Sequence, residues 1–331
     1  MLLAQQHALL ADIGASNARF ALLANGLLGP VRYFSVTDFP RFLDVLAAFW
    51  EQDCRGLPVT QAVLAVAGPI EANRCVLTNC SWVVDAQELS EAFGFDSVRV
   101  CNDFEAAALS LPYLADAHLH RLGGGISRPD APMVVLGPGT GLGLAGLVPA
   151  GQDWAVVGGE GGHATMPASS ADEDVILQHL RHEFGHVSAE RVISGQGLEN
   201  LYRAVAAVDG VAAPPLEAAS ITAAALAGTC ATAVRALDLF CAMLGTFAGN
   251  VALTFGARGG VYIAGGIAPR ITDFLTRSHF RERFEQKGRF RQYLEAIPTS
   301  VITHPFATFV GLQSLAMRGR AVGAPGEPAR G

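Results

Sequence analysis

The stretch Leu9-Leu-Ala-Asp-Ile-Gly-Ala-Ser-Asn-Ala-Arg-Phe-Ala-Leu-Leu23 consists of two apolar runs separated by the short turn Gly14-Ala-Ser-Asn17. Apolar runs of this length, joined by Gly and Asn residues, predict a β-hairpin. The same pattern returns at residues 133–148, where the turn is Gly137-Pro-Gly-Thr-Gly141. A strand–glycine turn–strand unit that occurs twice predicts a duplicated architecture.

Strands and helices alternate around these two hairpins. Apolar runs predict further strands at 31–36, 61–67, 97–101, 261–264 and 300–303. Helices are predicted at 38–50, 85–93, 172–183, from 194 onward, within 220–257 and at 306–317. Asp38, Asp85 and Ser194 are the expected N-terminal caps of three of them. The alternation is typical of an α/β fold.

Composition and charge exclude several classes of function. Half of the 331 residues are hydrophobic, 16% are charged and 37 are Gly, as in a compact α/β enzyme. The net charge of −7 and the lack of a basic stretch argue against nucleic acid as a partner. Only Lys287 among the basic residues is a lysine, so a Walker-type P-loop is unavailable. Any phosphate binding must therefore use backbone N–H groups and a metal ion.

The cysteines and the longest uncharged segment both favour a cytoplasmic protein. Six Cys occur without a C-x-x-C pair, so we expect buried, reduced thiols rather than disulfides or a zinc site. The N-terminus lacks the features of a signal peptide. Residues 239–257 carry no charge and contain Gly245-x-x-x-Gly249, which is compatible with a membrane span. Asn250 interrupts the run and a strand follows it, so we prefer a buried helix and expect no membrane association.

Three glycine-containing turns follow predicted strands. Asp12 ends the first strand beside a turn whose N–H groups can bind phosphate, and it is placed to hold Mg²⁺ through water. The turn at 137–143 opens a strand, which argues against a dinucleotide fingerprint. Gly265 and Gly266 would let a nucleotide approach the backbone closely. Taken singly, each match is better explained as an ordinary turn.

The stretch Val98-Arg-Val-Cys-Asn-Asp-Phe-Glu-Ala-Ala-Ala108 predicts a strand that delivers a polar pair to the start of a helix. Such a pair, here Asn102 and Asp103, is a common component of binding sites. Asn102 and Glu105 also match the capping-box pattern. A capping box provides hydrogen-bond acceptors for backbone N–H groups at the helix start and has a purely structural role. From this stretch alone, both interpretations remain open.

Two polar loops carry further candidates. Glu160 and His163 lie in the glycine-dense segment 158–163, which we expect to be neither strand nor helix interior, and Glu190 lies in a second loop. Carboxylates can accept hydrogen bonds from the hydroxyls of a sugar, and an imidazole can accept or donate them. For each residue taken alone, an exposed loop position is the simpler explanation.

Six motifs follow one another along the chain from residue 11 to residue 266. They are Ala11-Asp-Ile-Gly-Ala-Ser-Asn-Ala-Arg-Phe20, Cys101-Asn-Asp-Phe104, Gly137-Pro-Gly-Thr-Gly-Leu-Gly143, Gly159-Glu-Gly-Gly-His163, Gly185-His-Val-Ser-Ala-Glu-Arg-Val192 and Val261-Tyr-Ile-Ala-Gly-Gly266. Together they resemble the bacterial glucokinases, which share the actin-like ATPase fold of hexokinases. The resemblance runs in order from residue 9 to about 317, nearly the whole chain.

The resemblance implies an α/β, actin-like ATPase (ribonuclease H-like) fold, with two domains of duplicated type around a central cleft. The small domain is expected to comprise residues 1–113 and 305–320, and the large domain residues 114–304. The Pro/Gly-rich tail at 321–331 is expected to be disordered. A homodimer is also implied.

The resemblance further implies ATP and D-glucose as substrates, with Mg²⁺. It makes Asp103 the general base on the sugar 6-hydroxyl. The implied sugar-binding residues are Asn102, Asp103, Glu160, His163 and Glu190. The implied ATP-binding residues are Ala11, Asp12, Ile13, Gly14, Ala15, Ser16, Gly137, Gly139, Thr140, Gly141, Gly265 and Gly266. The chain departs from the family at Ala15 and Ser16, where Gly and Thr are usual.

Two other functions stay open. The chain could phosphorylate another hexose. It could also be a catalytically idle sugar-binding regulator, because one fold can have several unrelated functions. The retained Asp103 argues against the idle regulator. A sugar-free ATPase is disfavoured because Glu160, His163 and Glu190 would then have no role.

Overall fold

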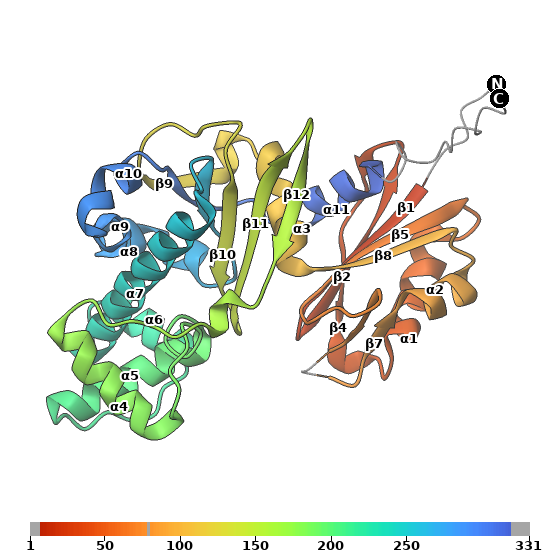
Figure 1. The fold of residues 1–331 in the computed structure, drawn as a ribbon. Coiled ribbons are helices and arrows are strands. Elements are labelled where there is room, and N and C mark those ends of the chain that lie inside the picture. Colours follow the sequence, from red (N-terminus) through yellow and green to blue (C-terminus); the bar gives the residue numbers. More distant parts are fainter. Residues whose placement is uncertain (1–6, 78–79, 319–331) are drawn as a thin grey trace. The chain divides into compact units, whose positions relative to one another are not determined.

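The computed structural model describes residues 7–77 and 80–318 (Figure 1). These residues form two compact units. Unit 1 contains the described residues up to Tyr113 together with those from Pro305 onward, and unit 2 is Leu114–His304. Each unit is built on its own six-stranded sheet. The predicted tail at 321–331 lies outside the described residues.

The sheet of unit 1 has the order β3-β2-β1-β5-β8, and β4 pairs with β2. Its strands are β1 (His7–Ile13), β2 (Asn17–Ala24), β3 (Leu27–Leu28), β4 (Arg32–Ser35), β5 (Val59–Val66) and β8 (Ser97–Asn102). The first predicted hairpin is confirmed, since β1 and β2 pair antiparallel. β1, β5 and β8 run parallel, and every residue of β1 is buried. Burial on both faces explains the nearly continuous apolar runs in the sequence.

The remaining elements of unit 1 flank this sheet or form a small separate one. They are η1 (Val36–Asp38), α1 (Phe42–Phe49), η2 (Trp50–Cys54), β6 (Arg74–Val76), β7 (Val83–Asp85), α2 (Ala86–Phe93), α3 (Asp103–Ser110), η3 (Leu111–Tyr113) and α11 (Ala307–Arg318). Asp85 caps α2 as predicted, because its carboxylate accepts the N–H groups of Gln87 and Glu88 at 2.9 and 3.3 Å.

The predicted cap at Asp38 is wrong. Asp38 ends the short helix η1, and α1 begins only at Phe42, with Arg41 as its N-cap and no side-chain capping bond. The reason is Pro40, which disfavours helical geometry in the residue before it. Phe39 accordingly has extended backbone angles, φ −131° and ψ 129°.

The sheet of unit 2 repeats this topology with the order β12-β11-β10-β13-β14-β9. Its strands are β9 (Leu119–Gly123), β10 (Met133–Pro138), β11 (Leu142–Ala150), β12 (Asp153–Gly158), β13 (Gly260–Ile263) and β14 (Thr299–Ile302). The antiparallel pair β10 and β11 corresponds to β1 and β2, and β10, β13 and β14 run parallel like β1, β5 and β8. The predicted duplication is therefore confirmed. The edge strands β9 and β12 were not predicted.

The helices of unit 2 lie mainly between β12 and β14 in the sequence. They are η4 (Asp116–His118), η5 (Gly161–His163), α4 (Ala171–Phe184), α5 (Gly195–Asp209), α6 (Ala218–Leu226), α7 (Ala231–Phe255), η6 (Ala268–Arg270), α8 (Thr272–Arg277), α9 (Phe280–Glu285), η7 (Gly288–Phe290) and α10 (Arg291–Glu295). Ser194 caps α5 as predicted, through a bond from Gly197 N–H at 2.9 Å. The glycine-dense segment 158–163 is more regular than predicted. Gly158 is the last residue of β12, and the last three residues of the segment form η5.

Helix α7 is a packing element of unit 2. Among the described residues it is the one helix whose length and hydropathy match a membrane span, and 83% of its most apolar window is buried within the protein. The motif Gly245-x-x-x-Gly249 of α7 has a packing role. A Cβ added at Gly245 would lie 2.1 Å from Phe280 O, and one at Gly249 would lie 2.6 Å from Phe284 O. The motif thus lets α9 approach the α7 backbone inside the unit.

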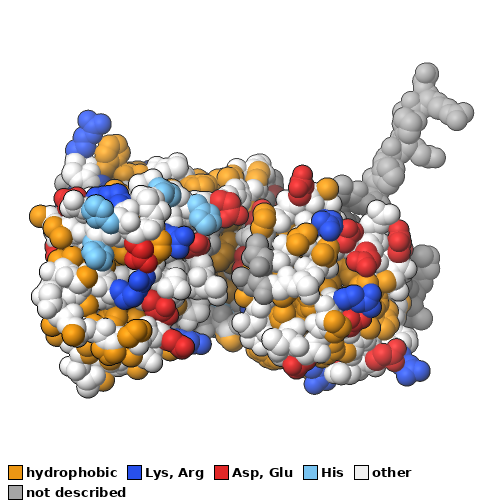
Figure 2. All heavy atoms as spheres, turned by 90° about the horizontal axis from the view of Figure 1, so that it is seen from below, with side chains coloured by type: hydrophobic (Ala, Val, Ile, Leu, Met, Phe, Trp, Pro, Cys, Tyr) orange, Lys and Arg blue, Asp and Glu red, His pale blue; other side chains and the backbone are white. Residues whose placement is uncertain are grey.

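Acidic and basic side chains are interspersed on the face of the molecule drawn in Figure 2. The single lysine is engaged in packing: Lys287 Nζ donates to Thr246 O at 3.0 Å and to Asn250 Oδ1 at 2.8 Å, both on α7. Burial lowers the pKa of Lys287, and repulsion from Arg283 adds to this effect. The lysine therefore stabilises the contact with α7 and is not placed to bind phosphate.

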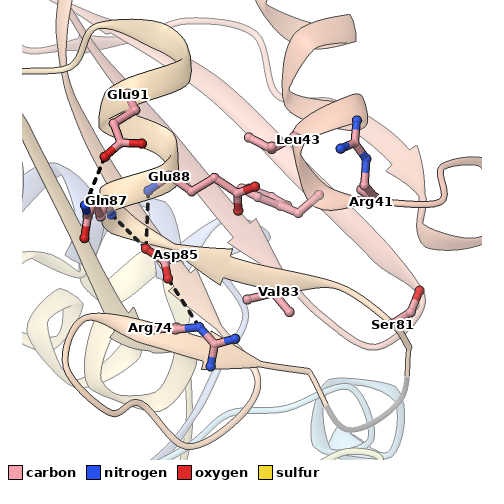
Figure 3. A pocket seen from close by; sticks show the side chains of 10 residues that line it. Arg41, Leu43, Arg74, Ser81, Val83, Asp85, Gln87, Glu88 and Glu91 are labelled. Atoms are coloured by element: carbon pink, nitrogen blue, oxygen red, sulfur yellow. Dashed lines mark hydrogen bonds and ion pairs between the residues drawn. The ribbon is translucent and has the colours of Figure 1, made fainter.

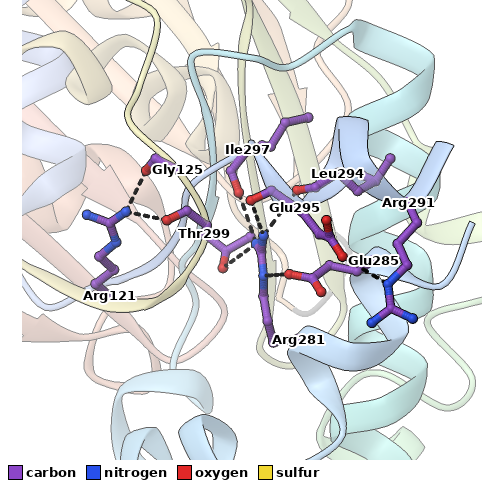
Figure 4. A network of polar contacts seen from close by, with 10 residues as sticks. Arg121, Gly125, Arg281, Glu285, Arg291, Leu294, Glu295, Ile297 and Thr299 are labelled. Atoms are coloured by element: carbon purple, nitrogen blue, oxygen red, sulfur yellow. Dashed lines mark hydrogen bonds and ion pairs between the residues drawn. The ribbon is translucent and has the colours of Figure 1, made fainter.

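Arg281 joins three elements of unit 2 (Figure 4). Its Nε pairs with Glu285 on the same helix, α9. Its two terminal nitrogens donate to Ile297 O, Thr299 Oγ1, Leu294 O and Glu295 O at 2.9–3.1 Å. The three carbonyls lie at the end of α10 and in the segment between α10 and β14, where helix termination leaves acceptors without partners. Arg281 supplies those partners.

All six cysteines are free thiols; Cys80 and Cys230 are half-buried and the other four are buried. Burial raises the pKa of the thiols of Cys54, Cys101 and Cys241 to about 12. The four buried thiols agree with the sequence-based expectation.

We expect iodoacetamide at pH 8 to leave Cys101 unmodified in the folded protein. Only the thiolate reacts, and a thiol with a pKa of about 12 is ionised to a fraction of roughly 10⁻⁴ at this pH. Its reactivity should rise as the pH approaches 12 or when urea unfolds the protein. Peptide mass mapping measures the modification. Labelling of Cys101 in the folded protein as fast as Cys80 would contradict the prediction.

Candidate active site

In unit 2, three chain segments meet around the carboxylate of Glu190. Leu142 N–H, at the start of β11, donates to Glu190 Oε2 at 2.9 Å, and Glu190 N–H donates to Gly162 O at 2.9 Å. Glycine is required at two of these contacts. A Cβ at Gly141 would lie 2.5 Å from Glu190 Oε2, and one at Gly162 would lie 2.2 Å from Leu142 O. The predicted phosphate turn, the loop at 158–163 and Glu190 are thus in direct contact.

The imidazole of His163 lies between two carboxylates. Its Nδ1 is 3.9 Å from Glu190 Oε1, and its Nε2 is 4.0 Å from Glu160 Oε2. These separations exceed hydrogen-bond length, so a ligand hydroxyl can bridge each pair. The side chains of Glu160 and His163 are 72% and 61% exposed, whereas that of Glu190 is 32% exposed. Polar groups with spare donors and acceptors that open to solvent can bind a polyol.

The end of β10 and the turn after β13 touch each other through their backbones. A Cβ added at Gly137 would lie 2.5 Å from the carbonyl carbon of Ala264. One added at Gly265, where φ is +82°, would lie 2.3 Å from Pro138 O. Gly266 differs, because a Cβ there would meet nothing within 4 Å. The predicted second phosphate loop and the predicted adenosine motif are therefore neighbours, and Gly266 faces open space.

A pocket of about 490 Å³ opens beside Gly139 and Thr140. Residues from α5, α6 and η6 complete it, among them Gly195, Thr222 and Arg270. Its volume is in the range of small-molecule sites. The sequence did not single out these residues: Thr222 lies in an Ala-rich helical segment, and Gly195 and Arg270 belong to none of the motifs. The pocket exists only because these helices pack beside the β10–β11 turn.

In unit 1, β8 ends at Asn102 and α3 begins at Asp103. Phe104 N–H donates to Asn102 Oδ1 at 2.9 Å and Asn102 N–H donates to Glu105 Oε2 at 3.3 Å, so the predicted capping box is present. Asn102 Nδ2 donates to Gly68 O at 3.3 Å. An amide nitrogen carries two hydrogens, so one remains for a ligand. Capping and ligand binding by Asn102 are therefore compatible.

The sheet register places the two predicted sites of unit 1 at the same end of the sheet, the carboxyl-terminal end of its parallel strands. Asp12 on β1 lies opposite Ala65 of β5, and Asn102 on β8 lies opposite Val66 of β5. Because these three strands are parallel, their carboxyl ends point the same way, and ligands bind beyond such ends in α/β sheets. The phosphate turn and the polar pair Asn102–Asp103 thus share one side of unit 1.

Asp12 has a partner that the sequence analysis missed. It is 4% exposed and forms a salt bridge with Arg19, its direct neighbour across the hairpin. Burial raises the pKa of Asp12, while Arg19 opposes this shift. The Arg19 contact has a signal in the sequence: the two residues are equidistant from the turn.

The residues at Asp12 fit a magnesium ion that is held mainly by nucleotide phosphates. Mg²⁺ commonly uses one or two carboxylates together with phosphate oxygens and water. Within residues 7–77 and 80–318, no group of three or more His, Cys, Asp or Glu side chains is gathered into a metal cage. A nucleotide-bound magnesium ion needs no such cage.

Ala15 adds no backbone strain to the first turn. The non-glycine residues with positive φ in the described part of the chain are Asn25, Ala72 and Asn73, so Ala15 takes an ordinary φ. Gly14 N–H donates to Asn17 O at 3.0 Å and closes the turn. The departure from the family pattern at Ala15 therefore needs no left-handed backbone geometry.

A second pocket of about 490 Å³, in unit 1, holds none of the predicted site residues (Figure 3). Both of its arginines are already paired: Arg74 contacts Asp85 of the pocket at 3.2 Å, and Arg41 contacts Asp44, outside the lining, at 2.7 Å. Paired surface charges contribute little to ligand binding, so we do not assign it a role.

Sequence comparisons agree with the motifs. The glucokinase family model matches residues 9–319. A glucokinase of Paramagnetospirillum magneticum is 45% identical over 313 residues, covering 94% of this chain and 97% of that protein. The bifunctional protein glk of Paraburkholderia xenovorans is 43% identical over 318 residues, covering 94% of this chain and 50% of that protein. The chain spans about half the length of such bifunctional curated relatives.

Comparison of structures leads to the same family. The crystal structure of a glucokinase from an Antarctic psychrotroph superimposes with a TM-score of 0.86 at 38% identity, covering 94% of this chain and 99% of that chain. A ROK family glucokinase from Streptomyces griseus, at 18% identity and a TM-score of 0.64, covers 95% of this chain and shares the fold. The two α/β units thus have the actin-like ATPase fold, and the chain belongs to the glucokinase family.

Proposed function

We propose that the chain is an ATP-dependent glucokinase, which converts ATP and D-glucose to ADP and D-glucose 6-phosphate. The observation that carries this proposal is the placement of Glu190. One carboxylate oxygen accepts the N–H of Leu142 at the end of the glycine turn, and the other faces His163. A single side chain thus connects a phosphate-type turn to a cluster that suits sugar hydroxyls.

The sugar is bound by carboxylate, imidazole and amide groups. In unit 2, Glu160 and Glu190 accept hydrogen bonds from sugar hydroxyls, and His163 shares hydroxyls with both carboxylates. Asn102 donates its remaining amide hydrogen. The separations of 3.9 and 4.0 Å around His163 support this role, because an oxygen placed beside each pair can lie within hydrogen-bond distance of both atoms.

Asp103 acts as the general base. Its position as the first residue of α3, next to Asn102, supports this role. It takes the proton of the sugar 6-hydroxyl as that oxygen attacks the γ-phosphorus, and the bond to the β–γ bridging oxygen breaks. Phosphoryl transfer depends mainly on positioning and charge stabilisation, so no covalent intermediate with the protein is needed.

The phosphates of the nucleotide are bound by backbone N–H groups of the two glycine turns, residues 11–16 and 137–141. The adenosine lies in the pocket beside Thr140, next to Gly265 and Gly266. Asp12 would hold Mg²⁺ through water, and the ion would supply positive charge against the phosphates. The lack of a lysine near either turn supports the use of backbone groups and a metal.

We expect glucose to have the highest kcat/KM when glucose, mannose and fructose are compared in a coupled assay of ADP release. Each misplaced hydroxyl leaves polar groups of the site without a partner, which lowers transition-state binding. ATP should be the preferred donor. A higher kcat/KM for mannose or fructose would make the chain a kinase of another hexose. No ADP release with any sugar would indicate the idle regulator.

The family resemblance also supports a homodimer that acts in the cytoplasm. Light scattering coupled to size-exclusion chromatography tests the oligomer. A dimer would have twice the chain mass of 34.6 kDa.

A further inference from the structure

We propose that Arg270 binds the phosphates of the nucleotide in the pocket beside Thr140, as a side-chain cation that acts next to the backbone N–H groups of the glycine turn. The inference rests on the proposed function and goes beyond it, since it names a residue that distinguishes a phosphorylated nucleoside from the bare nucleoside. All the residues that carry it belong to unit 2.

Arg270 is the one charged residue among the described residues that line this pocket. No acidic side chain of the lining therefore repels an anion there. Much of the remaining lining is apolar, namely Leu198, Ala218, Ala219, Ala223, Leu226 and Ile267. Ligand pockets typically combine such an apolar surface with a few polar groups that fix orientation. An apolar surface with a single cation suits a nucleoside that carries phosphate.

The guanidinium of Arg270 is available to a ligand. Within the described part of the chain it has no hydrogen bond, ion pair or ring contact, and Arg270 is exposed. Other arginines of unit 2 are committed, since Arg235 pairs with Asp172 and Asp209. A guanidinium has five N–H donors and binds phosphate in a bidentate manner. Arg270 can therefore bind an anion without breaking an existing contact.

Two backbone hydrogen bonds link Arg270 to the glycine turn. Ile267 N–H donates to Pro138 O at 3.3 Å, and Arg270 N–H donates to Ile267 O at 3.0 Å. The turn is also tied to the start of α5, because Gly195 N–H donates to Gly139 O at 2.9 Å. The backbone of Arg270 is thus anchored close to the turn, and its long side chain can reach an anion that the turn binds.

This role is one that lysine has in many phosphate-binding sites. The single lysine of the chain cannot take it, because Lys287 Nζ donates to Thr246 O and Asn250 Oδ1 and is engaged in packing. Arg270 supplies the side-chain cation in its place. Unlike a lysine, it keeps its charge at any pH at which the protein is folded.

The test is calorimetric titration of ADP and of adenosine, in the presence of Mg²⁺, into wild type, Arg270→Met and Arg270→Lys. Methionine keeps an unbranched apolar stem and removes the charge. We expect Arg270→Met to weaken ADP binding roughly 10-fold, as for a lost hydrogen bond to a charged group, and to leave adenosine binding unchanged. Arg270→Lys should recover part of the loss, because it keeps the charge without the planar fork.

The salt dependence of ADP binding provides a second readout. Dissolved ions screen the attraction between a guanidinium and a phosphate. The affinity of wild type for ADP should therefore fall more steeply with NaCl concentration than that of Arg270→Met. A residue that only shapes the pocket would leave this slope unchanged.

The matched control is Arg277→Met. Arg277 is an exposed residue of α8 outside the lining of this pocket, and its Nε donates to Asp273 O at 3.1 Å. Its loss should change neither titration. Equal weakening of ADP and adenosine binding by Arg270→Met, or an unchanged affinity for ADP, would overturn the role of Arg270. A wild-type protein that binds ADP but releases none from ATP with any sugar would instead overturn the proposed function.

Discussion

The Asp103→Asn variant is expected to lose a factor of ~10²–10⁴ in kcat for glucose phosphorylation, the usual contribution of a general base. Asparagine has the same shape and can still accept the Phe104 N–H that Asp103 accepts at 2.9 Å. It cannot take a proton from the 6-hydroxyl. Glucose binding should change by no more than about threefold, because the loss is confined to the transition state. Single-turnover kinetics and a glucose titration measure the two quantities.

The matched control for this variant is Glu105→Gln. Glu105 lies two residues further along α3 and accepts Asn102 N–H in the capping box. Glutamine keeps an oxygen for that bond, as capping boxes allow, so kcat should stay near the wild-type value. A kcat of Asp103→Asn within about tenfold of wild type would show that another group removes the proton.

The second large effect is expected at Glu190. Glu190→Gln should lower kcat/KM for glucose roughly 10- to 150-fold, because a hydrogen bond to a charged group contributes about 1.5–3 kcal/mol. Its amide oxygen can still accept Leu142 N–H. Glu190→Ala should lose more, since the N–H beside the phosphate turn also loses its acceptor. Steady-state kinetics with varied glucose and varied ATP separates the two effects: alanine should raise the KM for ATP as well.

An exposed carboxylate of unit 2 provides the comparison for these variants. Glu183 pairs with Arg203 at 3.1 Å on the surface, and Glu183→Gln should leave both KM values unchanged. Melting curves of all three variants test whether the fold is intact. If Glu190→Gln and Glu190→Ala both retained kcat/KM within threefold of wild type, Glu190 would have no role in sugar binding.

Much of the fold could be predicted because its signals are local. A glycine turn between two apolar runs predicts a hairpin whatever surrounds it, and both hairpins formed. The caps at Asp85 and Ser194 also formed, since a cap needs only the next few N–H groups. The wrong prediction at Asp38 came from the same kind of rule, applied without giving enough weight to Pro40, which delays the helix. The edge strands β9 and β12 were missed because short, partly exposed strands carry weak patterns.

Parts of the candidate site were harder to predict because their contacts are long-range. The motifs named Asp12, Asn102, Asp103 and Glu190, but not what surrounds them. That Glu190 accepts the N–H of Leu142, 48 residues away, follows from the packing of three loops. The pocket beside Thr140 likewise appears only when three helical segments are assembled next to one turn.

Local sequence chemistry thus determined the hairpins, the buried parallel strands, the caps and the order of the motifs, because each depends on residues close together in the chain. Tertiary structure alone decided that Gly311 brings α11 against α3. It also decided that Gly141 leaves space for Glu190. Such contacts depend on how distant elements fit together, and a turn or helix looks the same in sequence whether or not another element packs on it.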